Sequence, residues 1–457
     1  MRTAAVILAA GQGTRMKSAL PKVLHPVGGR PMILWSLDQA RAVGADPIVM
    51  VVGNGADRVR ERVGDGILYA TQREQLGTGH AALQAHGQLV GRSDAVLILY
   101  GDMPLLRPET LQRLVALHRK RQPAVTILSV VADDSMGFGR IVRDASGRAQ
   151  AIVEEAVATP EVLAIRELNC GVYCCRADWL WDRLPTVPKT EPKGEYYLTD
   201  IVGLAVAEGE AVEVLAIDDV SEVQGINSRA HLARSEAILR RRTAERLMEE
   251  GVTLIDPATT YVDATVRVGR DTVIYPNTHL QGETVIGERC AIGPNSIVRD
   301  TCVGDECTVL ASVLEYALLE DHVEIGPFGH LRKGAHLGAG VHMGNFGEVK
   351  NAYLAPGTKM GHFSYVGDAE IGEDVNIGAG TITCNYDGAR KHHTAIGKGA
   401  FIGSGTMLVA PVRVGKGAKI GAGSVVTRDV DDGTLAYGVP AKPKRRLGSE
   451  AGHDGSE

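Results

Sequence analysis

Aromatic residues are scarce in this sequence, and the patterns that mark several large classes of protein are missing. Phe, Trp and Tyr together make up 4% of the chain, which is little for a core built from bulky rings. No run of 18 apolar residues and no secretory leader is present, so we expect a cytoplasmic protein without a membrane span. The formal net charge of −6 offers no basic footprint for nucleic acid.

Cysteine gives no sign of a crosslinked or zinc-binding scaffold. The seven cysteines are scattered along the chain, and none of them forms a CxxC pair. We therefore expect free thiols. Cys384 lies in a polar stretch described below, where a catalytic thiol is conceivable, but an inert bystander is the expected role because a thiol nucleophile needs an activating neighbour.

Glycine, in contrast, is abundant, with 55 residues, and many glycines follow an aliphatic residue that recurs every six positions. The period holds at Val268, Ile274, Leu280, Ile286, Ile292 and Val298, at Ile325, Leu331, Leu337 and Met343, at Leu354, Met360 and Val366, and at Ile396, Ile402, Leu408, Val414, Ile420 and Val426. An amphipathic α-helix requires spacings of three and four, and a half-buried strand requires a spacing of two. The six-residue period therefore predicts a left-handed parallel β-helix with its aliphatic side chains on the axis and glycine at the corners.

The repeat is interrupted between Ile377 and Ile396. We expect the intervening stretch AGTITCNYDGARKHHTA, residues 379–395, to leave the prism as a loop. Insertions in repeat arrays collect on one face and often bind ligands. A generic β-helix is equally often a plain scaffold, so this polar stretch favours a binding role.

The chain is too long for one core, and a repeat array cannot share a core with a non-repetitive segment. Residues 1–227 alternate short aliphatic runs with helical stretches, which predicts an α/β domain with a mostly parallel, Rossmann-like sheet. Residues 228–250 have a helix-forming composition, with Ser228 as a cap and Gly251 as a stop, and predict a helical linker. Residues 251–457 form the predicted β-helix domain, and its final segment, GSEAGHDGSE, reads as a disordered tail.

The first predicted strand is followed by LAAGQGTRMKSALPK, a glycine turn with two cations. Gly11 and Gly13 let the backbone present N–H groups to phosphate oxygens, and Arg15 and Lys22 supply positive charge. The string is neither a Walker loop nor a complete dinucleotide fingerprint. A later predicted strand ends at Asp102, whose carboxylate could hold Mg²⁺ or cap the following helix.

Seven segments occur in a fixed order: LAAGQGTRMKSALPK, QREQLGTGHA, YGDMPLL, GFGRI, IVEE, ELNCGVY and GINSR. Together with the predicted β-helix, they resemble the bacterial bifunctional N-acetylglucosamine-1-phosphate uridyltransferase/glucosamine-1-phosphate acetyltransferase family over residues 4–430. The resemblance implies acetyl transfer from acetyl-CoA to glucosamine 1-phosphate. It also implies uridyl transfer from UTP to N-acetylglucosamine 1-phosphate, which gives pyrophosphate and UDP-N-acetylglucosamine, a precursor of cell wall and lipopolysaccharide.

By this resemblance, the N-terminal domain carries the uridyl-transfer site, with Arg15 and Lys22 as catalytic cations and Mg²⁺ on Asp102 and Asn227. The sugar phosphate attacks the α-phosphorus of UTP, so catalysis needs positioning and charge neutralisation but no protein nucleophile. The nucleotide-binding and sugar-binding positions that the resemblance implies are Leu8, Ala9, Ala10, Gly11, Lys22, Gln72, Gly77, Thr78, Tyr100, Gly101, Asp102, Gly139, Glu154, Asn169 and Asn227.

Acetyl transfer to an amine needs a base, and a neutral histidine suits this role near pH 7. Spacing alone cannot choose among the histidines of the repeat region, but the resemblance selects His362, oriented by Glu348. The resemblance implies that the sugar phosphate is bound by Arg332, Lys350, Tyr365 and Asn376. It implies that acetyl-CoA is bound by Ala379, Asn385, Tyr386, Ser404 and Ala422. It also implies a homotrimer with acetyl-transfer sites at the subunit interfaces.

The chain departs from the family pattern near its last coil, where Gly438 stands in place of a common arginine. The phosphates of coenzyme A are then expected to meet the basic residues that follow: Lys442, Lys444, Arg445 or Arg446.

Two alternative functions remain open. The chain could be a sugar-1-phosphate nucleotidyltransferase alone, with the β-helix as a trimerisation scaffold, although the loop with Asn385 and the presence of His362 argue against this. It could also be a regulatory subunit that senses sugar nucleotides, but a binding-only protein has no need for the complete set of Lys22, Asp102 and Asn227.

Overall fold

The computed structural model describes residues 1–190 and 194–446 and consists of two compact units, Met1–Leu239 and Arg240–Glu457. The boundary falls within helix α9, Arg229–Glu249, at whose start the Ser228 hydroxyl accepts from the His231 N–H at 3.2 Å. The division at 1–227, 228–250 and 251–457 stays a prediction, and the tail GSEAGHDGSE lies outside the described residues. Within residues 1–190 and 194–446, no helix has the length and apolar character to cross a membrane.

The first unit is built on a sheet whose main strands run in the order β13-β7-β10-β6-β1-β4-β5. β10 is antiparallel to both of its neighbours, while the other main strands are parallel to each other, which confirms the predicted mostly parallel α/β sheet. The bounds are β1 Thr3–Ala9, β4 Ile48–Val52, β5 Leu68–Thr71, β6 Ala95–Tyr100, β7 Val125–Val131, β10 Glu167–Arg176 and β13 Val212–Ile217, with β8 Arg140–Arg143 and β9 Ala149–Val153 beside β10.

Every residue of β1 is buried. Since successive side chains of a strand point to opposite faces, both faces of the sheet must be covered, and helices cover them. Ile7 belongs to the core packed under α1 and α5, whereas Val6 belongs to the core packed under α3, α7 and α8. The helices of the unit are α1 Met32–Ala42, α2 Ala56–Val63, α3 Thr78–Leu83, α4 His86–Leu89, α5 Pro108–Arg121, α6 Pro160–Leu163, α7 Ala177–Arg183 and α8 Asp200–Ala207.

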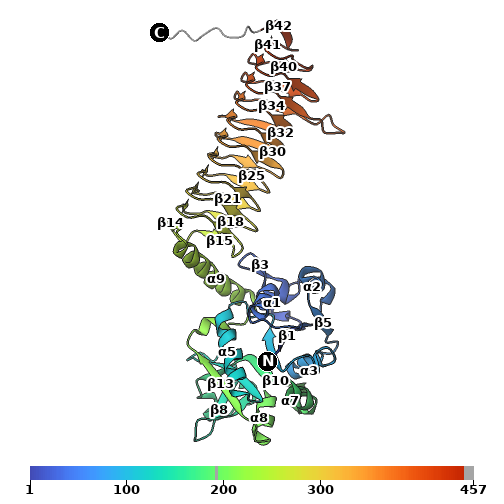
Figure 1. Ribbon diagram of the computed structural model, residues 1–457, viewed down its shortest axis with the longest axis vertical. Helices are drawn as coiled ribbons and strands as arrows, with labels where there is room; N and C mark the ends of the chain where they lie inside the picture. Colours follow the sequence, from blue (N-terminus) through green and yellow to red (C-terminus); the bar gives the residue numbers. More distant parts are fainter. Residues whose placement is uncertain (191–193, 447–457) are drawn as a thin grey trace. The chain divides into compact units, whose positions relative to one another are not determined.

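The second unit is a parallel β-helix, as predicted, with the short strands from β14 to β40 stacked coil upon coil (Figure 1). Each coil has three sides, because a strand pairs in parallel with the strand three places further on, as β17 does with β20 and β18 with β21. The strands used below are β14 Thr253–Leu254, β17 Val273–Ile274, β18 His279–Gln281, β20 Ala291–Ile292, β21 Ile297–Arg299, β28 Ala335–Leu337, β30 Gly347–Leu354, β32 Ser364–Ile371, β33 Asn376–Ile377, β34 Ile382–Cys384, β35 Thr394–Ile396, β40 Val425–Val426, β41 Thr434–Tyr437 and β42 Lys442–Arg446.

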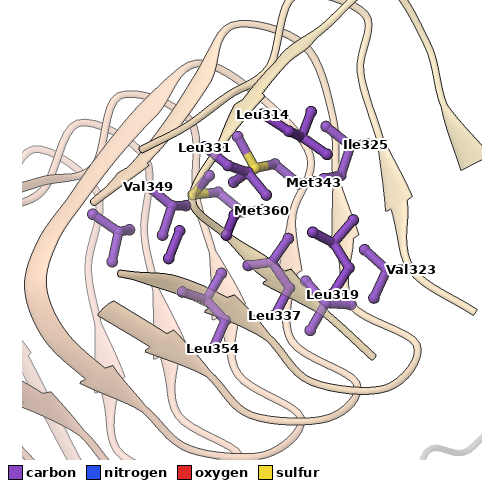
Figure 2. Packing of buried hydrophobic residues seen from close by; sticks show 14 of the residues in the cluster. Leu314, Leu319, Val323, Ile325, Leu331, Leu337, Met343, Val349, Leu354 and Met360 are labelled. Atoms are coloured by element: carbon purple, nitrogen blue, oxygen red, sulfur yellow. The ribbon is translucent and has the colours of Figure 1, made fainter. Parts of the chain in front are cut away.

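The predicted aliphatic residues fill the interior of the prism. Leu331, Leu337 and Met343 each have 0% of their surface exposed, and Figure 2 shows their side chains gathered in one interior with those of neighbouring coils. Burying such a side chain contributes about 1.5–3 kcal/mol. The narrow interior suits Val, Ile, Leu and Met, which explains the low aromatic content.

Corner side chains join the coils by hydrogen bonds that the six-residue period did not reveal. The Cys290 N–H donates to the Thr272 hydroxyl at 3.0 Å, and the Gly329 N–H donates to the Ser312 hydroxyl at 3.0 Å. These bonds satisfy backbone groups that would otherwise be buried without partners. All seven cysteines are free thiols, as predicted.

The interruption of the repeat is shorter than predicted. β34 continues the prism inside the stretch, and Thr383, 1% exposed, takes the axis position. Its hydroxyl accepts from the Gly367 N–H at 2.8 Å and donates to the Gly367 carbonyl at 3.0 Å, so a polar residue replaces the aliphatic one without an unsatisfied group. The prediction of a loop over 379–395 is therefore wrong at both ends, and residues 385–393 form the insertion between β34 and β35.

Candidate functional site

The first candidate site lies where two neighbouring parallel strands of the first unit end. β1 and β6 pair in register up to Leu8 and Tyr100, so the glycine turn after β1 and Asp102 after β6 lie side by side. A cavity of about 590 Å³ opens at this edge. Gly13 has φ 64, and a Cβ there would come within 2.6 Å of the Lys22 Cβ, so glycine lets the turn fold back onto Lys22.

Lys22 connects both predicted metal ligands. Its ammonium donates to the Asp102 carboxylate and, at 3.1 Å, to the Asn227 side-chain oxygen. The side chains of Lys22 and Asp102 are only 13% and 16% exposed. Two oxygens that surround one cation at the mouth of a partly buried cavity are suitable ligands for a hard divalent ion.

A second wall of the cavity comes from β10 and the segment before α8. The Asn169 amide donates to the Tyr173 hydroxyl at 2.7 Å, and the Thr199 hydroxyl donates to Glu154 at 3.0 Å. Burial, with Glu154 nearby, raises the pKa of the Tyr100 phenol far above its ordinary value. The wall therefore offers neutral hydroxyl and amide groups beside one carboxylate, as a site for sugar hydroxyls requires.

The third wall includes Gln72, which is 3% exposed. Its amide nitrogen lies 3.1 Å from the Gly77 carbonyl oxygen and 3.1 Å from His80 Nδ1. Gly77 has φ 101, and a Cβ there would meet the Tyr196 carbonyl oxygen at 2.5 Å. The Thr78 hydroxyl accepts from the Leu198 N–H at 3.0 Å, so both residues are fixed against the chain before α8.

The cavity contains nearly all positions that the sequence assigns to uridyl transfer. Gly101 is the exception: it is buried, and a Cβ there would meet Ile33 at 2.6 Å, so it acts through packing. The predicted residues that line the cavity are Leu8, Ala9, Ala10, Gly11, Arg15, Lys22, Gln72, Gly77, Thr78, Tyr100, Asp102, Gly139, Glu154, Asn169 and Asn227. The sequence analysis missed Glu195, Tyr197 and Thr199, which also line the cavity. The string EYYLTD, rich in polar and aromatic residues, could have indicated them.

The second candidate site lies on the prism. Arg332 donates to Glu348 at 2.9 Å, and Glu348 pairs in register with Tyr365 on the next coil. His362 lies in the exposed bend before β32. Among the described residues Glu348 is hydrogen-bonded to Arg332 and not to His362, so the orienting role of Glu348 stays a prediction.

The inserted loop meets this group at Asn385, which is 8% exposed. Its amide nitrogen lies 3.4 Å from the Tyr365 hydroxyl. Lys350 follows Glu348 on β30, and the neighbouring Lys391 and Arg332 lower the pKa of the Lys350 ammonium. Tyr386 is 61% exposed, and its hydroxyl donates to the Gly388 carbonyl at 2.6 Å within the loop.

The predicted acetyl-CoA positions Ala379, Ser404 and Ala422 stack at one corner of successive coils. The Gly405 N–H donates to the Ala379 carbonyl at 2.7 Å, and the Gly423 N–H donates to the Ser404 carbonyl at 2.8 Å. Asn376 lies in β33, on a different side of the prism from Glu348 and Tyr365. The predicted residues of the prism therefore form two separate clusters. One contains Arg332, Glu348, Lys350 and Tyr365, and the other is the corner stack of Ala379, Ser404 and Ala422.

Comparison with known protein families gives a different match for each of the two units of the chain. The MobA-like NTP transferase domain family matches residues 5–163, and the bacterial transferase hexapeptide family, with six repeats, matches residues 265–300 and 393–428. Fold and sites therefore define a nucleotidyltransferase joined to a left-handed β-helical, hexapeptide-repeat transferase.

Similar proteins cover nearly the whole chain. The bifunctional protein GlmU of Pelobacter propionicus is 50% identical over 437 residues, and that of Trichlorobacter lovleyi is 51% identical over 437 residues, with 95% of this chain and 95% of each relative covered. That of Enterococcus faecalis is 46% identical over 432 residues, with 94% of both chains covered. The chain belongs to the bifunctional GlmU family and is an enzyme with uridyltransferase and acetyltransferase activities.

Proposed function

We propose that the first unit performs uridyl transfer and the prism performs acetyl transfer, so that glucosamine 1-phosphate is converted in two steps to UDP-N-acetylglucosamine. The observation that carries this proposal is the cavity of about 590 Å³ in the first unit, which is lined by the residues expected for a nucleotide, a sugar and a cation. The second support is the cluster of Arg332, Glu348, Lys350 and Tyr365 on the prism, which contains the cations that a sugar phosphate needs.

In uridyl transfer, an oxygen of N-acetylglucosamine 1-phosphate attacks the α-phosphorus of UTP, and pyrophosphate leaves. Gln72, Gly77 and Thr78 bind the uracil edge, and Gly139, Glu154 and Asn169 hold the sugar. Arg15 and Lys22 neutralise the phosphates. Their contribution is positioning and charge compensation, since no covalent enzyme intermediate is involved.

Asp102 and Asn227 would hold Mg²⁺, because their oxygens already surround one cationic group, the Lys22 ammonium. The ion, when bound, supplies positive charge to the phosphate oxygens of UTP. Lys22 and a metal ion cannot occupy the same place, so Lys22 would turn toward the phosphates in the loaded site.

In acetyl transfer, the amine of glucosamine 1-phosphate attacks the thioester carbonyl of acetyl-CoA, and coenzyme A leaves as a thiol. His362 takes the proton from the attacking amine, while Arg332, Lys350, Tyr365 and Asn376 bind the sugar phosphate. Ala379, Asn385, Tyr386, Ser404 and Ala422 contact acetyl-CoA.

We further propose that the enzyme is a cytoplasmic homotrimer. The free thiols suit a reducing compartment. Phe328 and Phe346 stack with ring centroids 5.1 Å apart although they are 58% and 59% exposed, and such paired apolar surface is typical of a protein interface.

Two variants test the assignment of the reactions. The purified enzyme receives glucosamine 1-phosphate, acetyl-CoA, UTP and Mg²⁺, and free thiol and pyrophosphate are followed separately. We expect His362→Ala to lose thiol release but to keep pyrophosphate release from added N-acetylglucosamine 1-phosphate. Asp102→Ala should show the reverse pattern.

His342→Ala is the matched control, because His342 is also an exposed histidine of the prism and is paired with Glu324 at 2.9 Å. It should keep both activities. Wild-type enzyme that releases pyrophosphate but never thiol would make the prism a scaffold and refute the acetyl-transfer assignment.

A further inference from the structure

Asp368 occupies the corner of the prism at which, one coil later, the inserted loop of residues 385–393 begins. The same corner of earlier coils is occupied by Asp300 and Asn351, and all three have φ near 46 to 48. The Asp368 side chain is only 13% exposed. A carboxylate that is mostly removed from water needs hydrogen-bonding or charged partners.

Asp368 has three such partners. The Asn351 amide, one coil earlier, donates to Oδ1 at 2.6 Å. The Asn385 amide donates to Oδ2, and the Lys391 ammonium lies 3.9 Å from the same oxygen. Asn385 opens the loop and Lys391 lies in its returning arm, so one carboxylate holds both arms to the coil.

The loop beyond these residues is organised by its own contacts. Tyr386 and Lys391 form an antiparallel bridge, and the Asp387 carboxylate accepts from the backbone N–H groups of Ala389 at 2.8 Å and Arg390 at 2.6 Å. A loop with internal order moves as a body, so the contacts at its root set the position of the whole loop.

The root also reaches the proposed acetyl-transfer site. Asn385 lies beside the Tyr365 hydroxyl, and Lys391 lies beside Lys350. Gly367 leaves the necessary room, because a Cβ there would come within 2.2 Å of the Tyr365 hydroxyl and 2.9 Å of the Asn385 amide nitrogen.

We propose that Asp368 is a positioning residue for acetyl transfer: its carboxylate fixes the root of the loop and thereby holds Asn385 against Tyr365 and Lys391 against Lys350. This inference rests on the proposed function of the prism, but the attachment of the loop can be measured independently of that function.

The kinetic test is Asp368→Asn, which keeps the shape of the side chain and removes its charge. We expect kcat/KM for acetyl transfer to fall on the order of 10- to 100-fold, with a higher KM for glucosamine 1-phosphate because Lys391 is no longer held beside Lys350. Uridyl transfer from added N-acetylglucosamine 1-phosphate should keep its rate, which reports that the first unit is folded, and an unchanged far-UV circular dichroism spectrum would report that the prism is folded as well.

Asp300→Asn is the matched control. Asp300 has φ 46 and accepts from the Glu283 N–H at 2.9 Å, but it lies four coils before Asp368. It should leave acetyl transfer unchanged. Asp368→Asn with wild-type acetyl-transfer kinetics would overturn the inference.

Limited trypsin digestion tests the attachment itself, because Arg390 and Lys391 are cleavage sites within the loop. We expect faster cleavage there in Asp368→Asn than in wild type or Asp300→Asn. Equal cleavage rates would refute the attachment. If wild type shows no acetyl transfer while Asp368→Asn is cleaved faster, the proposed function fails but the attachment stands.

Lys391→Met provides a second route that leaves the prism intact, in case Asp368→Asn is unstable. If Asp368 acts through Lys391, the two changes are not additive, and the double variant loses little more acetyl-transfer activity than the worse single variant. Full additivity would show that Asp368 does not act through Lys391 and would overturn that part of the inference.

Discussion

At the scale of single residues, burial controls the protonation of His118 in α5. Its side chain is 2% exposed, and Nδ1 lies 2.9 Å from the Thr126 hydroxyl. Burial, assisted by the positive charge of Arg176, lowers the pKa of His118 from 6.5 to about 4. The unfolded chain therefore binds this proton more readily than the folded chain does. The stabilising effect of the neutral imidazole is complete above pH 6.5 and is lost as the pH falls toward 4.

We therefore predict that the free energy of unfolding of the first unit falls by about 3 kcal/mol between pH 7 and pH 4 because of His118 alone. His118→Gln, which keeps a polar partner for Thr126, should show a shallower dependence. Denaturant unfolding followed by tryptophan fluorescence measures this unit specifically, because Trp35, Trp179 and Trp181 all lie in it. Identical pH dependence in both proteins would contradict the prediction.

At the scale of elements, the prism is a stack in which each coil contacts mainly its neighbours. Leu337 in β28 is 0% exposed, whereas Leu318, on the outer surface of a neighbouring coil, is 40% exposed. The two leucines separate interior packing from surface effects on the same side of the prism.

Leu337→Ala should lower the free energy of unfolding of the prism by about 2–5 kcal/mol, since it leaves a cavity that the rigid coils cannot close. Leu318→Ala should cost less than about 1 kcal/mol. Far-UV circular dichroism during denaturant unfolding reports the secondary structure of both units, and tryptophan fluorescence reports the first unit alone. The change should appear in the circular dichroism transition, while the midpoint of the fluorescence transition stays the same. A comparable loss in both variants would argue against a tightly packed axis.

The last strand carries a second prediction at this scale. β42 pairs antiparallel with β41, and all of its residues are exposed; the Lys444 ammonium lies 4.9 Å from the centroid of the Tyr437 ring. The strand thus presents a fixed row of cations, as expected for a group that binds phosphates in place of the arginine missing at Gly438.

Replacing Lys442, Lys444, Arg445 and Arg446 together with alanine should raise the KM for acetyl-CoA on the order of tenfold and weaken its dependence on salt. Thiol release at varied acetyl-CoA and ionic strength measures both effects, and uridyl transfer serves as the control. An unchanged KM would mean that the coenzyme A phosphates are bound elsewhere.

At the scale of the whole molecule, the proposed trimer can be tested by mass. Light scattering coupled to gel filtration should give three times the chain mass of 48.5 kDa. Phe328→Ser combined with Phe346→Ser should shift the mass toward that of one chain, because the exposed stacked pair loses its apolar surface. A trimer that survives this change would place its interface away from these rings.

The sequence by itself determined the two kinds of architecture and most members of the first site. A six-residue period is a local property, and it needs no knowledge of distant contacts to predict a β-helix. In the same way, residues that follow parallel strands meet at one edge of a sheet, which is why the glycine turn before Lys22 and the Asp102 carboxylate could be expected at one place. Asn227 was added to them only by the family resemblance.

The tertiary structure decided what depends on contacts between coils or between distant segments. Thr383 keeps the prism going inside the predicted loop because Gly367 on the preceding coil satisfies its hydroxyl. Glu348 is paired with Arg332, and Asp368 joins both arms of the loop, because stacking places residues from different coils next to each other. Such neighbours are set by the pitch of the coil and by the excursion of the loop, and neither is contained in the period of the sequence.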